Sequence, residues 1–307
     1  MTERGFSREG CRSARRTLGI RPPLRPTRDH AVTWAPPGRN LARPGIVNLV
    51  ELNPPRQYAA DRNLHARQRL WSGQVPSFDI AAWVLDLAGL RPGARVLDVG
   101  CGNGLYLRAL RERRVIAVGC DRSSGMLRAA AHPALVNGDV TALPVRDGAF
   151  GVVLAAHLLD LVADRSTAIR ELRRALAPGG TCVAVTTGPQ HLRSLRELIE
   201  RAGRQGTPGW RISAPTGSAF TLGNAAAQLG VVFPGVTCVR PAGAGPVIIQ
   251  DAAIAADYVS SLAEHYQPQV ARAWPDIAED VRGQVQAVID TAGEFRTAGD
   301  LAAFVCR

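Results

Sequence analysis

Three glycines separated by single residues, Gly100, Gly102 and Gly104, follow an apolar stretch in the segment VLDVGCGNG (96–104). Glycine tolerates positive φ and lets a ligand approach the backbone closely, so this turn could bind a small molecule. Dinucleotide-binding turns have the spacing GxGxxG and place a pyrophosphate at the N-terminus of the next helix. The spacing here is GxGxG, and Asp98 stands two residues before the first glycine. An acid there favours a positively charged ligand, whose amino-acid portion it could bind directly or through water; it could instead hold a loop amide.

Two further acids follow apolar, strand-like segments, Asp121 at the end of VIAVGCD and Asp139 in NGDVTALP. A carboxylate at the end of the second strand can accept hydrogen bonds from both hydroxyls of a ribose. An aspartate after the third strand, with the amide of Val140, can bind the exocyclic amine and a ring nitrogen of adenine. A ribose, an adenine and a cationic amino acid without phosphate together describe S-adenosylmethionine.

Each of these residues also has a purely structural interpretation. Gly100 and Gly102 could serve only a tight turn, and Asp121 could cap the helix that begins at SSGML. Asp139 could form an Asx turn within GDVT.

With these motifs in register, the chain resembles the class I S-adenosylmethionine-dependent methyltransferases of the small-molecule, type 11 kind. The resemblance rests on VLDVGCGNG, on Asp121 in VGCDRSSGML, on Asp139 in GDVTALP and on RRALAPGG before the fifth strand, and it covers about 95–187. More weakly, QYAADRNLHARQRLW looks like the lid helix of small-molecule members, and FTLGNAAAQLGVVFP…YVSSL like their C-terminal extension. One departure is Phe150-Gly151 where the family has Phe-Asp, so that acid's role is absent or taken by Asp147.

The resemblance implies a set of cofactor-binding residues in the glycine turn, after the second and third strands, and on the lid. They are Asp98, Gly100, Cys101, Gly102, Asn103, Gly104, Asp121, Arg122, Asp139, Val140 and Tyr58. Tyr58 would close over the cofactor, although a tyrosine that only packs there is an alternative.

Methyl transfer is an in-line displacement, so proximity and orientation can supply much of the catalysis. A base is needed only if the nucleophile must lose a proton. His157, at the end of FGVVLAAH, is the candidate catalytic residue, and its ordinary pKa of about 6.5 suits a base. Asp160 and His191 are secondary candidates for this region. Arg62 and Arg69 could bind an acidic group of the substrate, or could be solvated helix charges.

Strand-like and helical segments alternate through the middle of the chain. The strands are expected at 94–100, 115–121, 134–139, 150–157 and 181–187, and the helices at 105–114, 123–131 and 166–177. Near-continuous apolar strands joined by helices predict a parallel sheet covered on both faces. Further helices are expected at 75–90, 191–203, 251–266 and 278–295, short strands at 236–242 and 246–251, a loop at 204–223 and a closing strand at 301–307.

The fold class that we predict is α/β, a doubly wound, mainly parallel seven-stranded sheet of Rossmann-like type with a helical N-terminal lid and a C-terminal insertion. Residues 1–46, rich in arginine and proline, are expected to be a disordered basic arm or a mis-assigned start. We expect the lid at 47–94, the S-adenosylmethionine-binding core at 95–187, and the rest of the fold with substrate cap helices and closing strands at 188–307.

Charge and cysteine usage narrow the class of protein. The formal charge of the 307 residues is +11, and all 37 basic residues are arginine. Residues 1–46 hold ten arginines against three acids, a balance of +7, which leaves only +4 for the remainder. A mildly basic folded part with 5% aromatic residues disfavours nucleic acid as a partner. Six scattered cysteines without a CxxC pair, no long apolar run and no secretory signal indicate a cytoplasmic protein without disulfides, structural metal or membrane span.

The function that we predict is S-adenosylmethionine-dependent methyl transfer to an oxygen, nitrogen or carbon nucleophile of a small molecule, with secondary metabolism as one setting. An RNA methyltransferase and a non-catalytic S-adenosylmethionine-binding partner or regulator are the alternatives. A nicotinamide oxidoreductase is disfavoured by the GxGxG spacing and by Asp98. The sequence identifies neither the methyl acceptor nor the oligomeric state.

Overall fold

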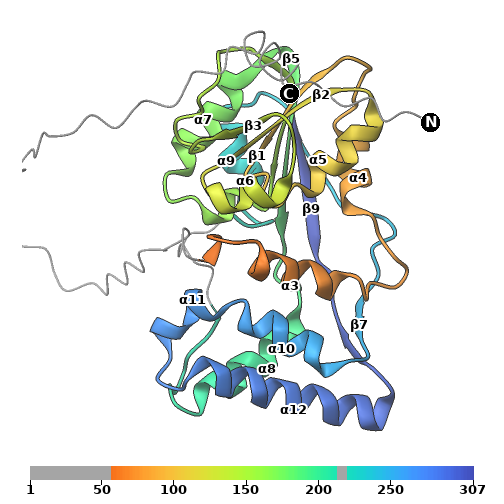
Figure 1. Cartoon of the computed structure of the whole chain (residues 1–307), viewed down its shortest axis with the longest axis vertical. Coiled ribbons are helices and arrows are strands. Elements are labelled where there is room, and N and C mark those ends of the chain that lie inside the picture. The colour runs from red at the N-terminus through yellow and green to blue at the C-terminus, as the bar shows by residue number, and fades with distance from the viewer. Residues whose placement is uncertain (1–56, 213–219) are drawn as a thin grey trace, which may run out of the picture.

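The structure is a computed structural model that describes residues 57–212 and 220–307 (Figure 1). The expected arm at 1–46 and residues 47–56 of the expected lid lie outside the described residues.

A seven-stranded sheet with the order β3-β2-β1-β4-β5-β9-β6 forms the centre of the upper part of the molecule in Figure 1. Its strands are β1 (Arg95–Val99), β2 (Ile116–Asp121), β3 (Leu135–Asn137), β4 (Phe150–Ala156), β5 (Leu176–Thr187), β6 (Val236–Val239) and β9 (Leu301–Cys306). The first five are parallel, and β9 runs antiparallel to both β5 and β6. The predicted mainly parallel seven-stranded sheet is confirmed.

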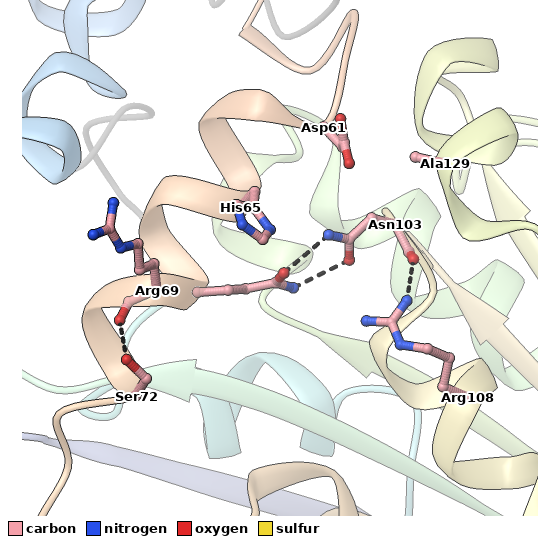
Figure 2. Close-up of a pocket in the computed structure, with 8 residues that line it drawn as sticks. Asp61, His65, Arg69, Ser72, Asn103, Arg108 and Ala129 are labelled. Atoms are coloured by element: carbon pink, nitrogen blue, oxygen red, sulfur yellow. Dashed lines mark hydrogen bonds between the residues drawn. The ribbon is translucent and has the colours of Figure 1, made fainter. Parts of the chain in front are cut away.

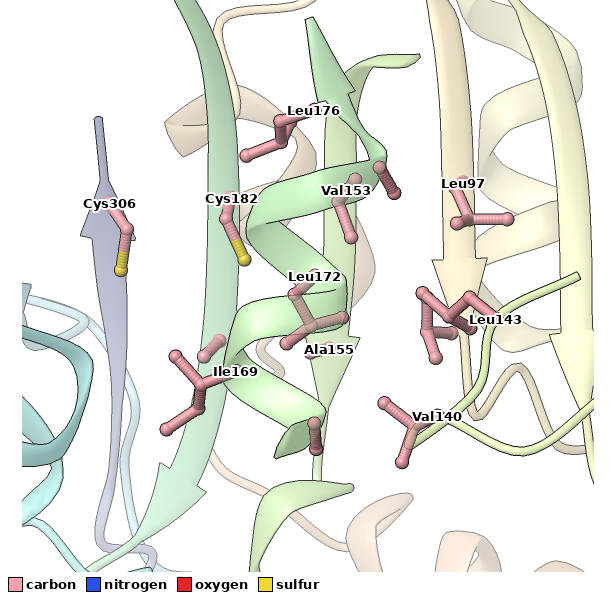
Figure 3. Packing of buried hydrophobic residues seen from close by; sticks show 14 of the residues in the cluster. Leu97, Val140, Leu143, Val153, Ala155, Ile169, Leu172, Leu176, Cys182 and Cys306 are labelled. Carbon is pink, nitrogen blue, oxygen red and sulfur yellow. The ribbon is translucent and has the colours of Figure 1, made fainter. Parts of the chain in front are cut away.

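Helices cover both faces of this sheet because successive strand residues point to opposite sides. They are α4 (Ile80–Leu87), α5 (Leu105–Leu110), α6 (Ser124–Ala130), α7 (Arg165–Ala175) and α9 (Ala225–Gly230). Leu97 belongs to a core cluster with α7 and α9, whereas its neighbour Val96 belongs to the cluster that contains α4 and α5. Figure 3 shows Ile169 and Leu172 of α7 facing the strands of the first cluster.

A second layer of helices, with its own apolar cluster, lies beyond one end of the sheet, and we call it the cap. It consists of α8 (Arg193–Arg204), α10 (Ala252–Ser260), α11 (Ala263–Tyr266), α12 (Trp274–Ala292) and a two-stranded antiparallel sheet of β7 (Val247–Ile249) and β8 (Phe295–Thr297). Helix α3 (Arg62–Trp71) lies between the sheet and α10 (Figure 1), and its Leu70 joins the cap cluster.

The cap is where the sequence-based expectations were least accurate. The helix expected at 278–295 ends at Ala292, because Gly293 adopts φ +82° and terminates it, and the following residues form β8. The helix expected at 251–266 is divided into α10 and α11. Within the part of the chain that the structure describes, no helix is both long and apolar enough to cross a membrane.

Candidate functional site

The glycine turn between β1 and α5 is tight and closely covered. Gly100, Gly102 and Gly104 all have positive φ, at +69°, +51° and +84°. A Cβ at Gly100 would lie 2.8 Å from the Leu158 side chain, and one at Gly102 would lie 3.0 Å from Leu64 of α3. The turn therefore needs glycine both for its backbone conformation and for the side chains that pack over it.

Asp98 lies on β1 directly before this turn and is only 1% exposed. Its Oδ2 has no hydrogen-bond partner among the described residues. Burial and, after it, the negative charge of Asp121 together raise the pKa of the Asp98 carboxyl to about 8. A buried carboxyl without a partner is costly to ionise, and a cationic ligand would remove that cost.

Asp121, at the end of β2, holds the glycine turn in place. Its Oδ2 accepts a hydrogen bond from the Gly102 amide at 2.9 Å, and its Oδ1 accepts one from the Ser123 amide at 2.8 Å. Burial raises the pKa of Asp121, and these two hydrogen bonds oppose that rise. The N-cap residue of helix α6 is Ser123, whose hydroxyl accepts a hydrogen bond from the Met126 amide at 3.2 Å. The carboxylate that holds the Gly102 amide of the glycine turn is therefore Asp121.

The loop after β3 contains an Asx turn. Asp139 Oδ1 accepts from the amide and the hydroxyl of Thr141, at 2.9 and 2.8 Å. Its Oδ2 remains on the side of Arg122, 3.9 Å from that guanidinium, and Val140 is buried beside it. Asn137, which the sequence analysis did not single out, donates to the carbonyls of Asp121 and Arg122 and so joins this loop to the end of β2.

The other two residues predicted from the turn itself, Cys101 and Asn103, are both buried. Asn103 forms a reciprocal amide pair with Gln68 of α3, with N–O distances of 2.9 and 3.1 Å (Figure 2). Gln68 was missed because nothing in the sequence marks which face of α3 meets the turn.

Residues 58–60 cover the start of α6. The Tyr58 carbonyl accepts a hydrogen bond from the Ser123 hydroxyl, and the Ala59 carbonyl lies where a Cβ on Gly125 would be. The Tyr58 hydroxyl accepts a hydrogen bond from Arg67 of α3 at 2.9 Å. Arg67 also donates to the hydroxyl and carbonyl of Ser261, so it joins the lid to the cap.

A polar cavity of about 480 Å³ lies where α3 meets α5 and α6 (Figure 2). It is lined by Asp61, His65, Gln68, Arg69, Ser72, Asn103, Arg108 and Ala129. Arg108 donates to the Asn103 carbonyl at 2.6 Å. Because Asn103 belongs to the glycine turn and lines the cavity, the cavity borders that turn. Arg69 pairs with Asp257 at 3.1 Å, and Arg62 is exposed.

His157 follows β4 directly and has φ +52°, with its amide bonded to the Val185 carbonyl at 2.9 Å. Its side chain retains exposed surface, yet burial lowers its pKa to about 4. Because the next residue, Leu158, packs over Gly100, His157 lies beside the glycine turn.

The two secondary candidates lie in the same region. Burial lowers the pKa of His191 to about 4, and His157 contributes to the shift. His191 Nδ1 lies 3.1 Å from the Asp300 carbonyl, and its ring is 5.1 Å from that of Trp71. Burial raises the pKa of Asp160 to about 6. Within 57–212 and 220–307, no three metal-ligating side chains gather as a metal site would require.

The chain is similar to known methyltransferases in both sequence and structure. A family model described as a methyltransferase domain matches residues 97–184. A solved protein of Anabaena variabilis, described as a methyltransferase from an antibiotic biosynthesis pathway, superposes with a TM-score of 0.53 at 16% identity, over 74% of this chain and 96% of that one. Residues 97–184 form a class I methyltransferase domain.

Two curated relatives match part of this chain. A malonyl-[acyl-carrier protein] O-methyltransferase of Serratia marcescens is 32% identical over 128 residues, which is 40% of this chain and 50% of that protein. A demethylmenaquinone methyltransferase of Beutenbergia cavernae is 39% identical over 103 residues, 32% of this chain and 43% of that protein. The chain spans about half the length of the curated relatives that it matches.

At Gly151, where the sequence analysis expected the family's acid to be either absent or replaced by Asp147, the structure shows what Asp147 contacts. Asp147 pairs with Arg174 of α7 at 2.7 Å. Arg174 also binds Glu171 and the carbonyls of Val145 and Leu143. This network joins the loop before β4 to α7.

Proposed function

We propose that the protein is a methyltransferase that uses S-adenosylmethionine to methylate a small molecule. One observation carries the proposal: Asp98 and Asp121 face the same glycine turn, and Oδ2 of Asp98 has no hydrogen-bond donor among the described residues. Two carboxylates and a tight glycine turn fit a ligand with a cationic amino-acid portion and a ribose. They fit a pyrophosphate poorly, because the negative charge of Asp121 would repel it.

Different residues of the site would bind different parts of this cofactor. Asp98 would hold the ammonium group, Asp121 the ribose hydroxyls, and Asp139 with the Val140 amide the adenine. Cys101, Asn103 and Arg122 would line the same site, and Tyr58 would close it. S-adenosylmethionine, when bound, supplies a methyl group on a positively charged sulfur.

The chain's own contribution to the reaction is orientation, exclusion of water and control of one proton. Leu64 and Leu158 pack over the glycine turn and keep water from it. His157, with a pKa lowered to about 4, is neutral at pH 7 and can accept a hydrogen bond that orients the acceptor. The pKa of Asp160, raised to about 6, is better matched to a proton acceptor near neutral pH.

A small-molecule acceptor is supported by the names of the relatives, a malonyl-[acyl-carrier protein] O-methyltransferase and a demethylmenaquinone methyltransferase. A nucleic-acid acceptor would need a surface of available arginines. The described arginines are instead often paired with acids along the chain, as in Arg113–Asp86, Arg272–Asp280 and Arg282–Glu279. We therefore propose a cytoplasmic enzyme that acts on a metabolite and not on RNA.

The test is calorimetry of the intact protein with S-adenosylhomocysteine, and with NADH for comparison. We expect heat from the former alone. Removing a charged hydrogen-bond partner costs about 1.5–3 kcal/mol, so Asp121→Ala should weaken binding at least about tenfold. Asp290→Ala, which removes an exposed carboxylate on α12, is the control. Absence of heat with S-adenosylhomocysteine would refute the proposal.

A further inference from the structure

Arg196 on α8 is a half-buried cation whose hydrogen-bonding capacity is largely unused. One of its terminal nitrogens donates to the Pro189 carbonyl at 3.2 Å. Its Nε is buried and has no partner among the described residues. A guanidinium has five N–H donors, so most of them remain available.

The carboxylates close to Arg196 along the chain are already occupied. Glu197 pairs with Arg193 at 2.8 Å, and Glu200 pairs with Arg204 at 2.5 Å and Arg211 at 3.1 Å. Within the part of the chain that the structure describes, Arg196 forms no salt bridge, whereas its neighbours on α8 do.

The same arginine lines a cavity of about 240 Å³ between the start of α8 and the loop that follows β5. Pro189, Gln190, Arg193 and Arg211 also line it, together with Glu197 and Glu200, whose carboxylates are paired with arginines. A cavity of this volume has room for a carboxylate or a phosphate group.

Arg196 lies beside the loop that carries His191, because its guanidinium donates to the carbonyl of Pro189, two residues before His191. Its positive charge lowers the pKa of His191, which the charge of His157 lowers as well. Burial raises the pKa of Tyr258 on α10, and the charges of Arg67 and Arg196 oppose that rise. Electrostatic effects weaken with distance, so these shifts agree with the position of Arg196 beside the His191 loop. The loops of His157 and His191 follow the carboxyl ends of β4 and β5, where sheets of this kind bind ligands.

We propose that Arg196 binds an oxyanion of the methyl acceptor, a carboxylate or a phosphate, and thereby selects anionic small molecules. The inference rests on the proposed function, because it concerns the acceptor of that reaction. A partly desolvated cation without a counter-ion is unfavourable, and an anionic ligand would supply the missing partner. The planar guanidinium can bind either oxyanion through two parallel hydrogen bonds.

The experiment compares Arg196→Met, which keeps the length of the side chain, with Arg196→Lys and with Arg201→Met. Arg201 is exposed on the same helix and is the matched control. Small carboxylic acids and phosphate monoesters are offered as acceptors of a radiolabelled methyl group, each beside its neutral amide or dephosphorylated counterpart. In parallel, melting temperatures are measured with malonate, with inorganic phosphate and with chloride at equal ionic strength. These melts are run with and without S-adenosylhomocysteine.

We expect charged acceptors to be preferred, and either malonate or phosphate to raise the melting temperature of the wild type and of Arg201→Met. Which of the two acts distinguishes a carboxylate from a phosphate. Arg196→Met should lose the anion effect and raise KM for the acceptor at least about tenfold, with Arg196→Lys between the two. Equal use of neutral and charged acceptors, or an Arg196→Met variant with unchanged KM and anion effect, would overturn the inference. The proposed function would still stand in that case, provided that the protein binds S-adenosylhomocysteine. Loss of that binding in the wild type would refute the function itself.

Discussion

Asp98 should release a proton when S-adenosylmethionine or S-adenosylhomocysteine binds. In the free protein its buried carboxyl has a pKa of about 8, so at pH 7 about nine-tenths of the molecules carry the protonated form. The ammonium group of the ligand would stabilise the carboxylate. The pKa of Asp98 should therefore fall on binding, and the proton should leave.

The size of the effect follows from the same pKa. If binding lowers it below about 5, close to 0.9 proton is released per ligand at pH 7. Between about pH 6 and pH 8 the contribution of Asp98 to binding should strengthen nearly tenfold per pH unit, which corresponds to about 1.4 kcal/mol.

The assay is isothermal titration calorimetry at pH 7 in phosphate and in Tris, whose ionisation enthalpies differ. The dependence of the apparent enthalpy on the buffer reports the number of protons exchanged. Asp98→Asn provides the control, because it cannot ionise but leaves the titration of the ligand's own amino group unchanged. The same proton number in the wild type and in Asp98→Asn would refute the role that we assign to Asp98.

Three further predictions follow from the site. Asp98→Asn should be more stable than the wild type at pH 8. Because the pKa of Asp98 is raised, the folded protein holds a proton that the unfolded chain has lost, so the stability of the wild type falls as pH rises from about 4 to 8. Urea unfolding at pH 5 and pH 8 checks this, and an equal difference in stability between the two proteins at both pH values would contradict it. Gly100→Ala should lose about 1–3 kcal/mol of unfolding free energy through its φ of +69° and the Leu158 contact, whereas Gly283→Ala, in an open position of α12, should gain about 0.5–1 kcal/mol, and both are measured by urea unfolding. The methyl-transfer rate should fall as pH drops through about 6, because Asp160 then becomes protonated. Asp160→Asn should abolish this pH dependence, whereas His157→Gln should retain it. The opposite pattern in the pH profiles would assign the proton acceptor to His157.

The order of strands and helices from β1 to β5 could be predicted because it is a local property. Near-continuous apolar segments, helix periodicity and glycine or proline at the ends are visible within short windows of sequence. The glycine turn could be found in the same way, since Gly100, Gly102 and Gly104 must meet a backbone requirement that neighbouring residues reveal.

The cap could not be derived in this way, because its contacts join segments far apart in the chain. β8 is three residues long and exists through its pairing with β7, almost fifty residues earlier. Gln68 and Asn103 are 35 positions apart, and Arg67 meets Ser261 across 194 positions. No local pattern records such contacts.

The sequence by itself determined the sheet, the glycine turn and the acids at the ends of its strands. Only the tertiary structure decided which carboxylate holds the Gly102 amide, which one stays without a partner, and that Arg196 has no counter-ion within the described residues. The physical reason is that hydrogen-bond partners, burial and the resulting pKa shifts depend on groups brought together from distant parts of the chain.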